Sequence, residues 1–193
     1  MNASPLTLSD LRSAVVGRWV SLSVELRPTE DRTGSGSITP TFLTRIFTYH
    51  ADDTFEGIIR LFGDPWGQLP LLQFEFRGHL KWGGPHPIAS GAFEIDYVLD
   101  RAFLVTPLHE QAAAMLNAVP AQGLKPFRAN EAQDILQKAF PMFNIAEGQT
   151  VIDYDLLLLR DEHLYFGAKH VDGTPFDRSD RRPQQLQVPL IRG

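Results

Sequence analysis

Apolar and polar residues alternate along much of the chain, a period-two pattern that predicts β-strands with one buried face. The clearest run spans residues 71–82, where Gly78 marks a bend, and residues 91–99 repeat the pattern. Glu94 and Asp96 fall on the polar face of the second run. We therefore expect the apolar faces of both runs to point into the core, with Phe74, Phe76, Trp82, Phe93, Ile95 and Tyr97.

The segment 42–62 predicts a β-hairpin around which the chain is organised. Residues 42–49 and 54–62 are rich in aromatic and β-branched residues, and Ala51-Asp52-Asp53 between them suits a tight turn. Both strands carry apolar residues on both faces, whereas a small barrel has one inner face. The second face therefore needs cover, either from a helical segment or from a partner subunit.

Further strands follow from the same alternation. Residues 17–28 predict one strand whose apolar face carries four residues from Val20 to Leu26, and a Gly/Ser/Thr-rich loop follows at 29–40. After a turn at Asp100-Arg101, more strands are expected at 102–106, 151–160, 164–168 and 186–191. Short strands at this spacing are typical of an antiparallel barrel or sandwich.

Three helices interrupt the strands. A short N-terminal helix is expected at 5–15, capped by Ser9 or Asp10, and an Ala-rich helix at 107–119 is expected to start at Thr106-Pro107. Asn130 and Gln133 resemble a capping box for a helix at 130–140. We therefore expect a single domain, 1–193, that is a mainly β, antiparallel barrel of about 8–10 strands with a helical insertion at about 107–141.

Composition narrows the classes of function. The chain has 193 residues, a 43% hydrophobic share and a net charge of −5 spread along its length, which argues against a nucleic-acid partner. It has no cysteine, so disulfides and thiolate chemistry are excluded. No stretch approaches the ~18 apolar residues of a membrane span. Because the start lacks the features of a secretory signal, we expect a cytoplasmic protein.

Motifs for catalysis or cofactor binding are missing from the sequence. We find no nucleophile elbow, phosphate-binding loop, dinucleotide fingerprint or zinc-protease motif. The six histidines are dispersed, and His50 near Asp52 and Asp53 is better explained by a turn than by a metal site. We therefore expect no catalytic residue, metal or cofactor. An enzyme acting on an apolar substrate remains an alternative, with Tyr49, His50 or Glu56 as its acid or base.

An ordered set of short segments resembles the APCDD domain (adenomatosis polyposis coli down-regulated). No single segment is specific, but together they extend from residue 17 to residue 190 in the family's order. They are Gly17-Arg18-Trp19-Val20-Ser21, residues 24–28, Phe42-Leu43-Thr44-Arg45, Tyr49-His50, Thr54-Phe55-Glu56-Gly57, Phe76-Arg77-Gly78, Gly91, Glu94, Asp96-Tyr97, residues 105–107, Leu116-Asn117, Arg182-Pro183 and Pro189-Leu190.

The resemblance implies a lipocalin- or calycin-like barrel that holds a lipid or acyl chain in an apolar cavity. Animal members of the family are secreted, membrane-tethered antagonists of Wnt signalling and have two such barrels. This chain lacks the family's paired cysteines, and its sequence predicts one barrel. The implied fold and cavity therefore transfer, Wnt binding does not, and the chain looks like a bacterial or otherwise intracellular relative.

The site expected from these observations is the interior of the barrel. We predict a non-enzymatic carrier or sensor of an apolar molecule or fatty acid, whose polar end meets Arg45 near the mouth. A barrel filled by its own aromatic side chains is the alternative, and the chain would then be an interaction module with a protein partner or a second copy. The expected ligand-binding residues are Trp19, Arg45, Phe47, Phe55, Phe74, Phe76, Trp82, Phe93, Ile95 and Tyr97.

Overall fold

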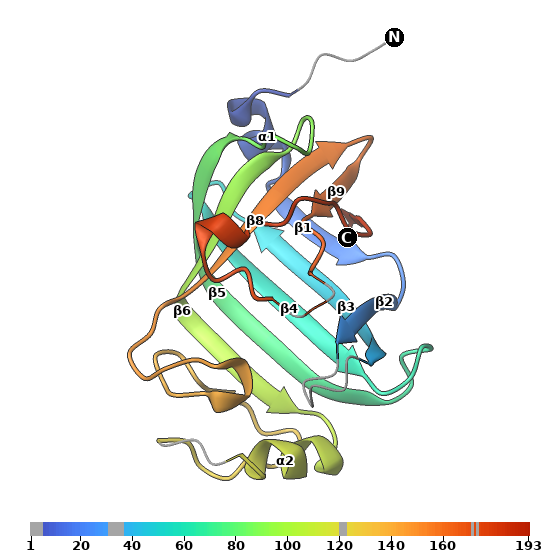
Figure 1. The fold of residues 1–193 in the computed structure, drawn as a ribbon, viewed down its shortest axis with the longest axis vertical. Coiled ribbons are helices and arrows are strands. Elements are labelled where there is room, and N and C mark those ends of the chain that lie inside the picture. Colours follow the sequence, from blue (N-terminus) through green and yellow to red (C-terminus); the bar gives the residue numbers. More distant parts are fainter. Residues whose placement is uncertain (1–5, 31–36, 120–122, 171, 173) are drawn as a thin grey trace.

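Ten antiparallel strands form one sheet in a computed structural model that describes residues 6–30, 37–119, 123–170, 172 and 174–193 (Figure 1). The sheet order is β1-β10-β9-β8-β6-β5-β4-β3, and β3 pairs with β1 again, which closes a ring. Of the ten strands, β2 and β7 lie outside this ring, which leaves eight. The expected mainly β, antiparallel barrel is therefore confirmed.

The strands are β1 (Gly17–Ser21), β2 (Glu25–Glu30), β3 (Ile38–Tyr49), β4 (Thr54–Phe62), β5 (Pro70–Pro85), β6 (Phe93–Pro107), β7 (Gln133–Asp134), β8 (Val151–Arg160), β9 (His163–Phe166) and β10 (Leu190–Arg192). The α-helices are α1 (Leu8–Ala14) and α2 (Glu110–Asn117), and two 3₁₀ turns span Pro141–Phe143 and Ser179–Arg181.

The predicted hairpin is the β3–β4 pair. Its register runs from Tyr49 opposite Phe55 to Phe42 opposite Phe62, and Asp53 has a positive φ of 58° in the turn. Asp tolerates this left-handed conformation better than most residues. The helix α2 packs near β5 and β6, so it does not supply the cover predicted for the outer face of the hairpin.

The predicted strand at 71–82 is confirmed as β5, but the predicted turn at Asp100-Arg101 is wrong. Residues 93–107 form the single strand β6, and its register with β5 shifts at Gly78. A Cβ on Gly78 would lie 1.8 Å from the carbonyl oxygen of Val98. Because the strands approach so closely there, the extra residues of β6 are absorbed by a bulge instead of ending the strand.

The predicted strand at 17–28 is divided into β1 and β2, and its buried face is the opposite of the one expected. Leu22 and Leu26 are 72% and 62% exposed, whereas Trp19 and Glu25 are buried. The inward side chain of β2 is a carboxylate because an arginine on β3 pairs with it inside the barrel. Part of the predicted 29–40 loop belongs to β2 and β3, and its centre, 31–36, lies outside the described residues.

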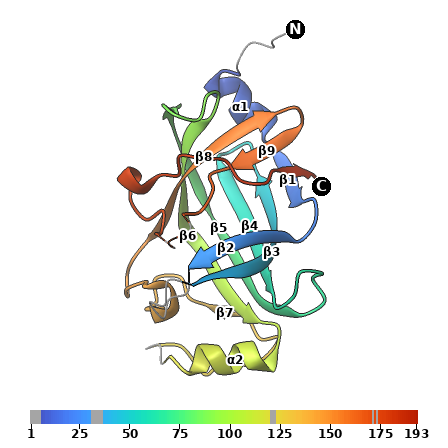
Figure 2. The ribbon, with the colours of Figure 1, turned by 45° about the vertical axis from the view of Figure 1, so that its right-hand side comes forward.

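The helix α1 covers one end of the barrel (Figures 1 and 2). Its cap is Thr7, not Ser9 or Asp10, because the Thr7 hydroxyl accepts from the Asp10 N–H while the Asp10 carboxylate accepts from the Thr7 N–H. Leu11 and Val15 are buried in the core with Trp19, whose Nε1 donates to the Val15 carbonyl at 2.7 Å.

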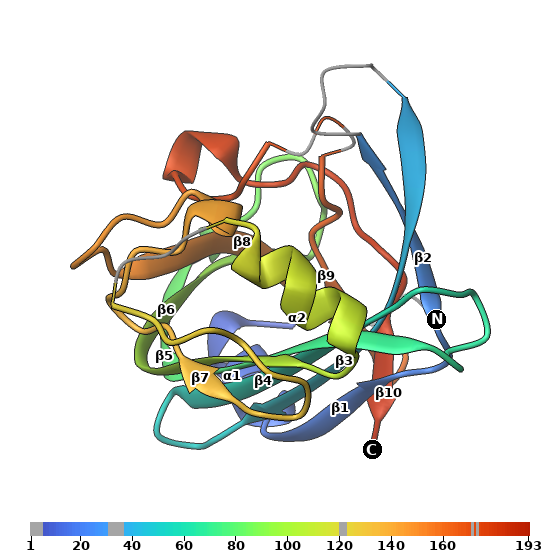
Figure 3. The ribbon, with the colours of Figure 1, turned by 90° about the horizontal axis from the view of Figure 1, so that it is seen from below.

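The predicted helical insertion lies at the opposite end, where α2 crosses the barrel (Figure 3). Its helix begins after His109, not at Thr106, because Thr106 still pairs with Gln73 in the sheet. The predicted helix at 130–140 is wrong: that segment contains β7 and turns. Asn130 has a left-handed φ of 65°, and the Gln133 side chain bonds the backbone of Lys125 instead of capping a helix.

Candidate functional site

The half of the barrel next to α1 is filled by aromatic side chains. Tyr49 and Phe55 are each only 1% exposed, and the Phe47 ring lies 4.7 Å from that of Phe166 between centroids. The hydroxyls of Tyr49 and Tyr97 lie 2.6 Å apart, and burial raises the pKa of both groups, which keeps them neutral. This part of the interior is packed by the chain itself, and we call these contacting rings the aromatic cluster: Phe47, Tyr49, Phe55, Phe76, Tyr97 and Phe166.

Most of the expected ligand-binding residues belong to the continuous hydrophobic core that includes the aromatic cluster. Trp82 is half-buried at its edge and donates from Nε1 to Asp53 at 2.9 Å. The others in this core are buried: Trp19, Phe47, Phe55, Phe74, Phe76, Phe93, Ile95 and Tyr97. Ligand binding by these residues stays a prediction, and their position gives them a structural role in the core.

Toward α2, part of the inner surface of the barrel is less deeply buried, although Phe74 there packs against Phe143 with ring centroids 5.1 Å apart. Ile59 and Leu61 lie on the same face of β4 as Phe55, and Leu72 lies on the same face of β5 as Phe74, yet all three are half-buried. They form two cross-strand rows, which we call the apolar rows. The first contains Ile59 and Phe74, and the second contains Leu43, Leu61 and Leu72. Solvent reaches this inner surface, unlike the aromatic cluster.

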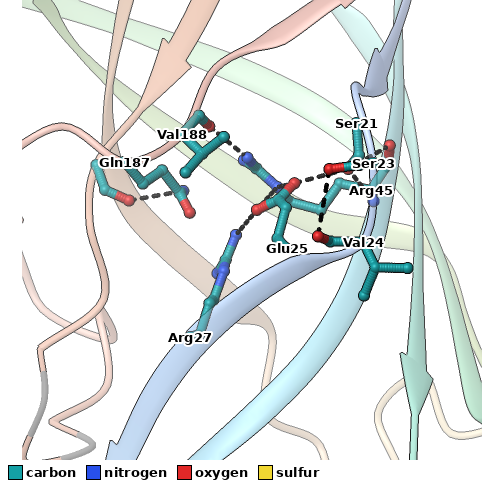
Figure 4. A network of polar contacts seen from close by, with 9 residues as sticks. Ser21, Ser23, Val24, Glu25, Arg27, Arg45, Gln187 and Val188 are labelled. Carbon is teal, nitrogen blue, oxygen red and sulfur yellow. Dashed lines mark hydrogen bonds and ion pairs between the residues drawn. The ribbon is translucent and has the colours of Figure 1, made fainter. Parts of the chain in front are cut away.

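A polar cluster lies on β2 and β3 (Figure 4). It adjoins the apolar rows, because Arg45 is opposite Ile59 and Glu25 is opposite Leu43. The Arg45 side chain is 2% exposed, and its Nε donates to both carboxylate oxygens of Glu25 at 2.8 and 3.2 Å. Its Nη2 donates to the Val188 carbonyl at 2.7 Å, and its guanidinium lies over the Phe166 ring at 5.0 Å. These contacts hold Arg45 in one buried position.

Arg27 is the second arginine of the polar cluster. Its Nη2 lies 3.4 Å from Glu25 Oε2, an oxygen that Arg45 Nε also contacts at 3.2 Å, and the Arg27 side chain is 15% exposed. Burial, and then the neighbouring Arg45, lower the pKa of Arg27 to about 10, so it is still charged at neutral pH. The Arg27 Nε and the Arg45 Nη1 are buried and have no hydrogen-bond partner in the described part of the chain.

Asp155 adds a buried carboxyl group from β8. It accepts hydrogen bonds from the backbone N–H groups of Leu156 at 2.7 Å and Gly167 at 2.8 Å. Burial, and then the charge of Asp153, raise the pKa of Asp155 to about 7. Near neutral pH this group is therefore divided between its charged and neutral forms.

The predicted location of Arg45 near the mouth is wrong, because Glu25 and the Val188 carbonyl hold it inside. Its carboxylate partner is Glu25, whereas Glu94 and Asp96 on β6 are both bound by Arg182, at 3.6 and 2.6 Å. Sequence reasoning missed Glu25, Arg27 and Asp155. The useful signal was that Glu25 and Arg27 share one face of a strand whose other face carries Leu26.

The alternative sites do not assemble. Tyr49 is buried in the core, while His50 and Glu56 lie on the exposed surface 3.8 Å apart. Among the described residues there is no group of three or more potential metal ligands. In the same residues, no helix has the length and apolarity needed to cross a membrane.

Two surface hollows lie outside the ring. One, of about 220 Å³, lies between α1 and the β3–β4 turn and is lined by Arg12 and Asp53, which form an ion pair. The other, of about 310 Å³, lies beside α2 and includes Leu116 and Phe127. Neither hollow is lined by the aromatic cluster or by the apolar rows.

Comparison with protein families gives a match over most of the chain. The model of the family described as "Adenomatosis polyposis coli down-regulated 1" matches residues 1–139 of the 193. The matched part runs from α1 to β7 and contains the apolar rows, Glu25 and both arginines of the polar cluster. Asp155 and the strands β8 to β10 lie beyond it.

Proposed function

Because the chain belongs to the adenomatosis polyposis coli down-regulated 1 family, we propose that it is a binding module for a small apolar molecule, held on the apolar rows. The observation that carries this proposal is a contrast inside one barrel. Tyr49 and Phe55 at the α1 end are 1% exposed, whereas Ile59 and Leu61 on the same inner face remain half-buried.

An alkyl or acyl chain is the ligand shape that suits these rows. Leu43, Leu61 and Leu72 are opposite one another on three neighbouring strands, so they present a continuous apolar line. Burying a methylene contributes about 0.8 kcal/mol, so roughly ten enclosed methylenes supply the ~8 kcal/mol of micromolar binding. The ligand rests against Phe74, and the aromatic cluster below it forms a rigid base.

Calorimetric titration with alkyl chains of increasing length tests the proposal. The affinity should rise with each added methylene, by a factor of up to about four. Ile59→Ser should weaken binding because it places a hydroxyl on the inner rows. Ile58→Ser is the matched control, since Ile58 is the half-buried neighbour on the outer face of the same strand.

Binding that is lost equally in both variants, or no saturable binding by any chain, would contradict the proposal. Native mass spectrometry of the purified protein provides a second measurement, because a carrier should retain an apolar molecule through purification.

An interaction module is the second candidate, favoured by exposed apolar residues on the outer surface. Leu22, Leu26 and Trp66 are 72%, 62% and 76% exposed. A surface that binds a protein partner or a second copy commonly exposes such residues. Sedimentation of the wild-type protein and of Trp66→Ser and Leu26→Ser at increasing concentration tests for self-association through these residues.

A further inference from the structure

The polar cluster contains more positive than negative charge. Arg27 and Arg45 share the single carboxylate of Glu25, and Figure 4 shows the two guanidinium groups approaching it from different sides. A charge inside a protein is costly unless it is paired. Asp155 on β8 does not supply a full counter-charge, because burial raises its pKa to about 7.

The two arginines differ in how far their donors are already used. Arg45 makes two bonds to Glu25 and one to Val188, and it lies over Phe166. Arg27 makes one long contact of 3.4 Å with Glu25 although a guanidinium has five N–H donors. It is also the more exposed of the two, at 15% against 2% for the side chains. Arg27 is therefore the group that can meet a ligand.

The position of Arg27 relative to the apolar rows suggests how a ligand would lie. Glu25 is opposite Leu43, which begins the second apolar row, and Arg27 lies two residues further along the same face of β2. The line from Glu25 on β2 through the second apolar row to Leu72 on β5 crosses three strand spacings, or about 14 Å at ~4.8 Å each. The positively charged Arg27 therefore lies near one end of this line, and the apolar side chains of the second row extend away from it.

We propose that the ligand is a single-chain amphiphile with an anionic head, such as a carboxylate, whose head pairs with Arg27 and whose tail lies on the apolar rows. This inference rests on the proposed function and adds the class of ligand and a residue that determines specificity. The pairing is charge-assisted and offers two parallel N–H donors to a carboxylate. A neutral head leaves the excess charge unpaired, and a cationic head is repelled.

Three probes with a ten-carbon chain and different heads test the inference: decanoate, decanol and decyltrimethylammonium, titrated calorimetrically at pH 6, where Asp155 is mostly neutral and decanoate is mostly ionised. Decanoate should bind at least tenfold more tightly than decanol, and the cation more weakly than both. Arg27→Met should abolish the preference for decanoate, whereas Arg27→Lys should retain part of it, because lysine keeps the charge but not the two parallel donors. Arg60→Met is the matched control and should change nothing, because Arg60 is an exposed arginine of β4 that binds Gln73.

The outcomes separate the inference from the proposed function. If decanoate and decanol bind equally and Arg27→Met affects neither, the anionic head is refuted while apolar binding stands. If none of the three probes binds, both fail. Acetate should bind at least a hundredfold more weakly than decanoate; equal affinities would show a site for small anions and overturn the amphiphile. Thermal unfolding of Arg27→Met and Arg27→Lys separates a loss of binding from a loss of fold.

Discussion

The hydroxyl groups of Tyr49 and Tyr97 meet 2.6 Å apart inside the barrel. Tyr49 belongs to β3 and Tyr97 to β6, two strands that β4 and β5 separate in the sheet. The hydrogen bond therefore joins two walls across the interior instead of two neighbouring strands. Both side chains are almost fully buried, so each hydroxyl depends on the other for a partner.

Removing either hydroxyl should destabilise the protein. Tyr97→Phe leaves the Tyr49 hydroxyl buried and unpaired, at a cost of about 1–3 kcal/mol in the free energy of unfolding. Tyr49→Phe should cost a similar amount, while the double variant should cost clearly less than the sum. Urea denaturation of the four proteins gives this double-mutant cycle, and strictly additive effects would show that the two hydroxyls do not interact.

Gly57 should not tolerate a side chain. A Cβ at this position would lie 2.0 Å from the Phe76 ring on the neighbouring strand, and that ring is held in the aromatic cluster. Gly57→Ala should therefore cost about 1–3 kcal/mol by overpacking. The free-energy cost of Gly57→Ala should be smaller in a Phe76→Leu background than in wild type, because the smaller side chain leaves room for the Cβ. Chemical denaturation of the four proteins measures both costs. Equal costs in both backgrounds would place the strain elsewhere.

Glu25 should be essential for the stability of the polar cluster. Glu25→Gln leaves two like-charged guanidinium groups without their common carboxylate, a change that costs about 3–5 kcal/mol when a buried pair is broken. Glu94→Gln is the matched control, because Glu94 is partly exposed and lies 3.6 Å from its arginine. Its loss should cost less than about 1 kcal/mol. Equal losses in thermal unfolding would contradict the buried role of Glu25.

The sequence predicted the barrel well because strands with strict alternation dominate it. The 71–82 run and the 42–62 hairpin have strong local signals: period-two apolar residues and an Asp-rich turn. The buried face of residues 17–28 was predicted wrongly, because alternation shows that the two faces of a strand differ but not which of them is buried. The pairing of Glu25 with Arg45 determines which face is buried. Because Arg45 lies twenty residues away, no local sequence pattern contains this pairing.

The insertion was predicted less well for a related physical reason. Asn130 and Gln133 have the residue types of a capping box, but β7 pairs with β6, and that tertiary contact overrides the local signal. No local sequence pattern indicated that Asp155 is buried, because its burial arises from strands that meet only in the closed ring. The part of the site formed by single strands was therefore predictable, and the part formed by contacts between distant segments was not.

Asp155 should make the stability of the protein depend on pH near neutrality. Its ordinary pKa is 3.8, and burial followed by the charge of Asp153 raises it to about 7 in the folded protein. Between these values the folded state holds a proton that the unfolded chain has released. Stability should therefore fall as the pH rises from about 4 to 7, by up to about 1.4 kcal/mol per pH unit for this group.

Asp155→Asn should remove this contribution while its side-chain oxygen still accepts the N–H bonds of Leu156 and Gly167. The variant should gain stability relative to wild type as the pH rises through this window, and the gain should level off above pH 7. Urea denaturation of both proteins from pH 4.5 to 8.5 measures the difference, in which ionisations common to both cancel. Asp153→Asn should lower the pKa of Asp155 in the folded protein and so narrow the window from its upper end. Parallel pH profiles for wild type and Asp155→Asn would refute the shifted ionisation.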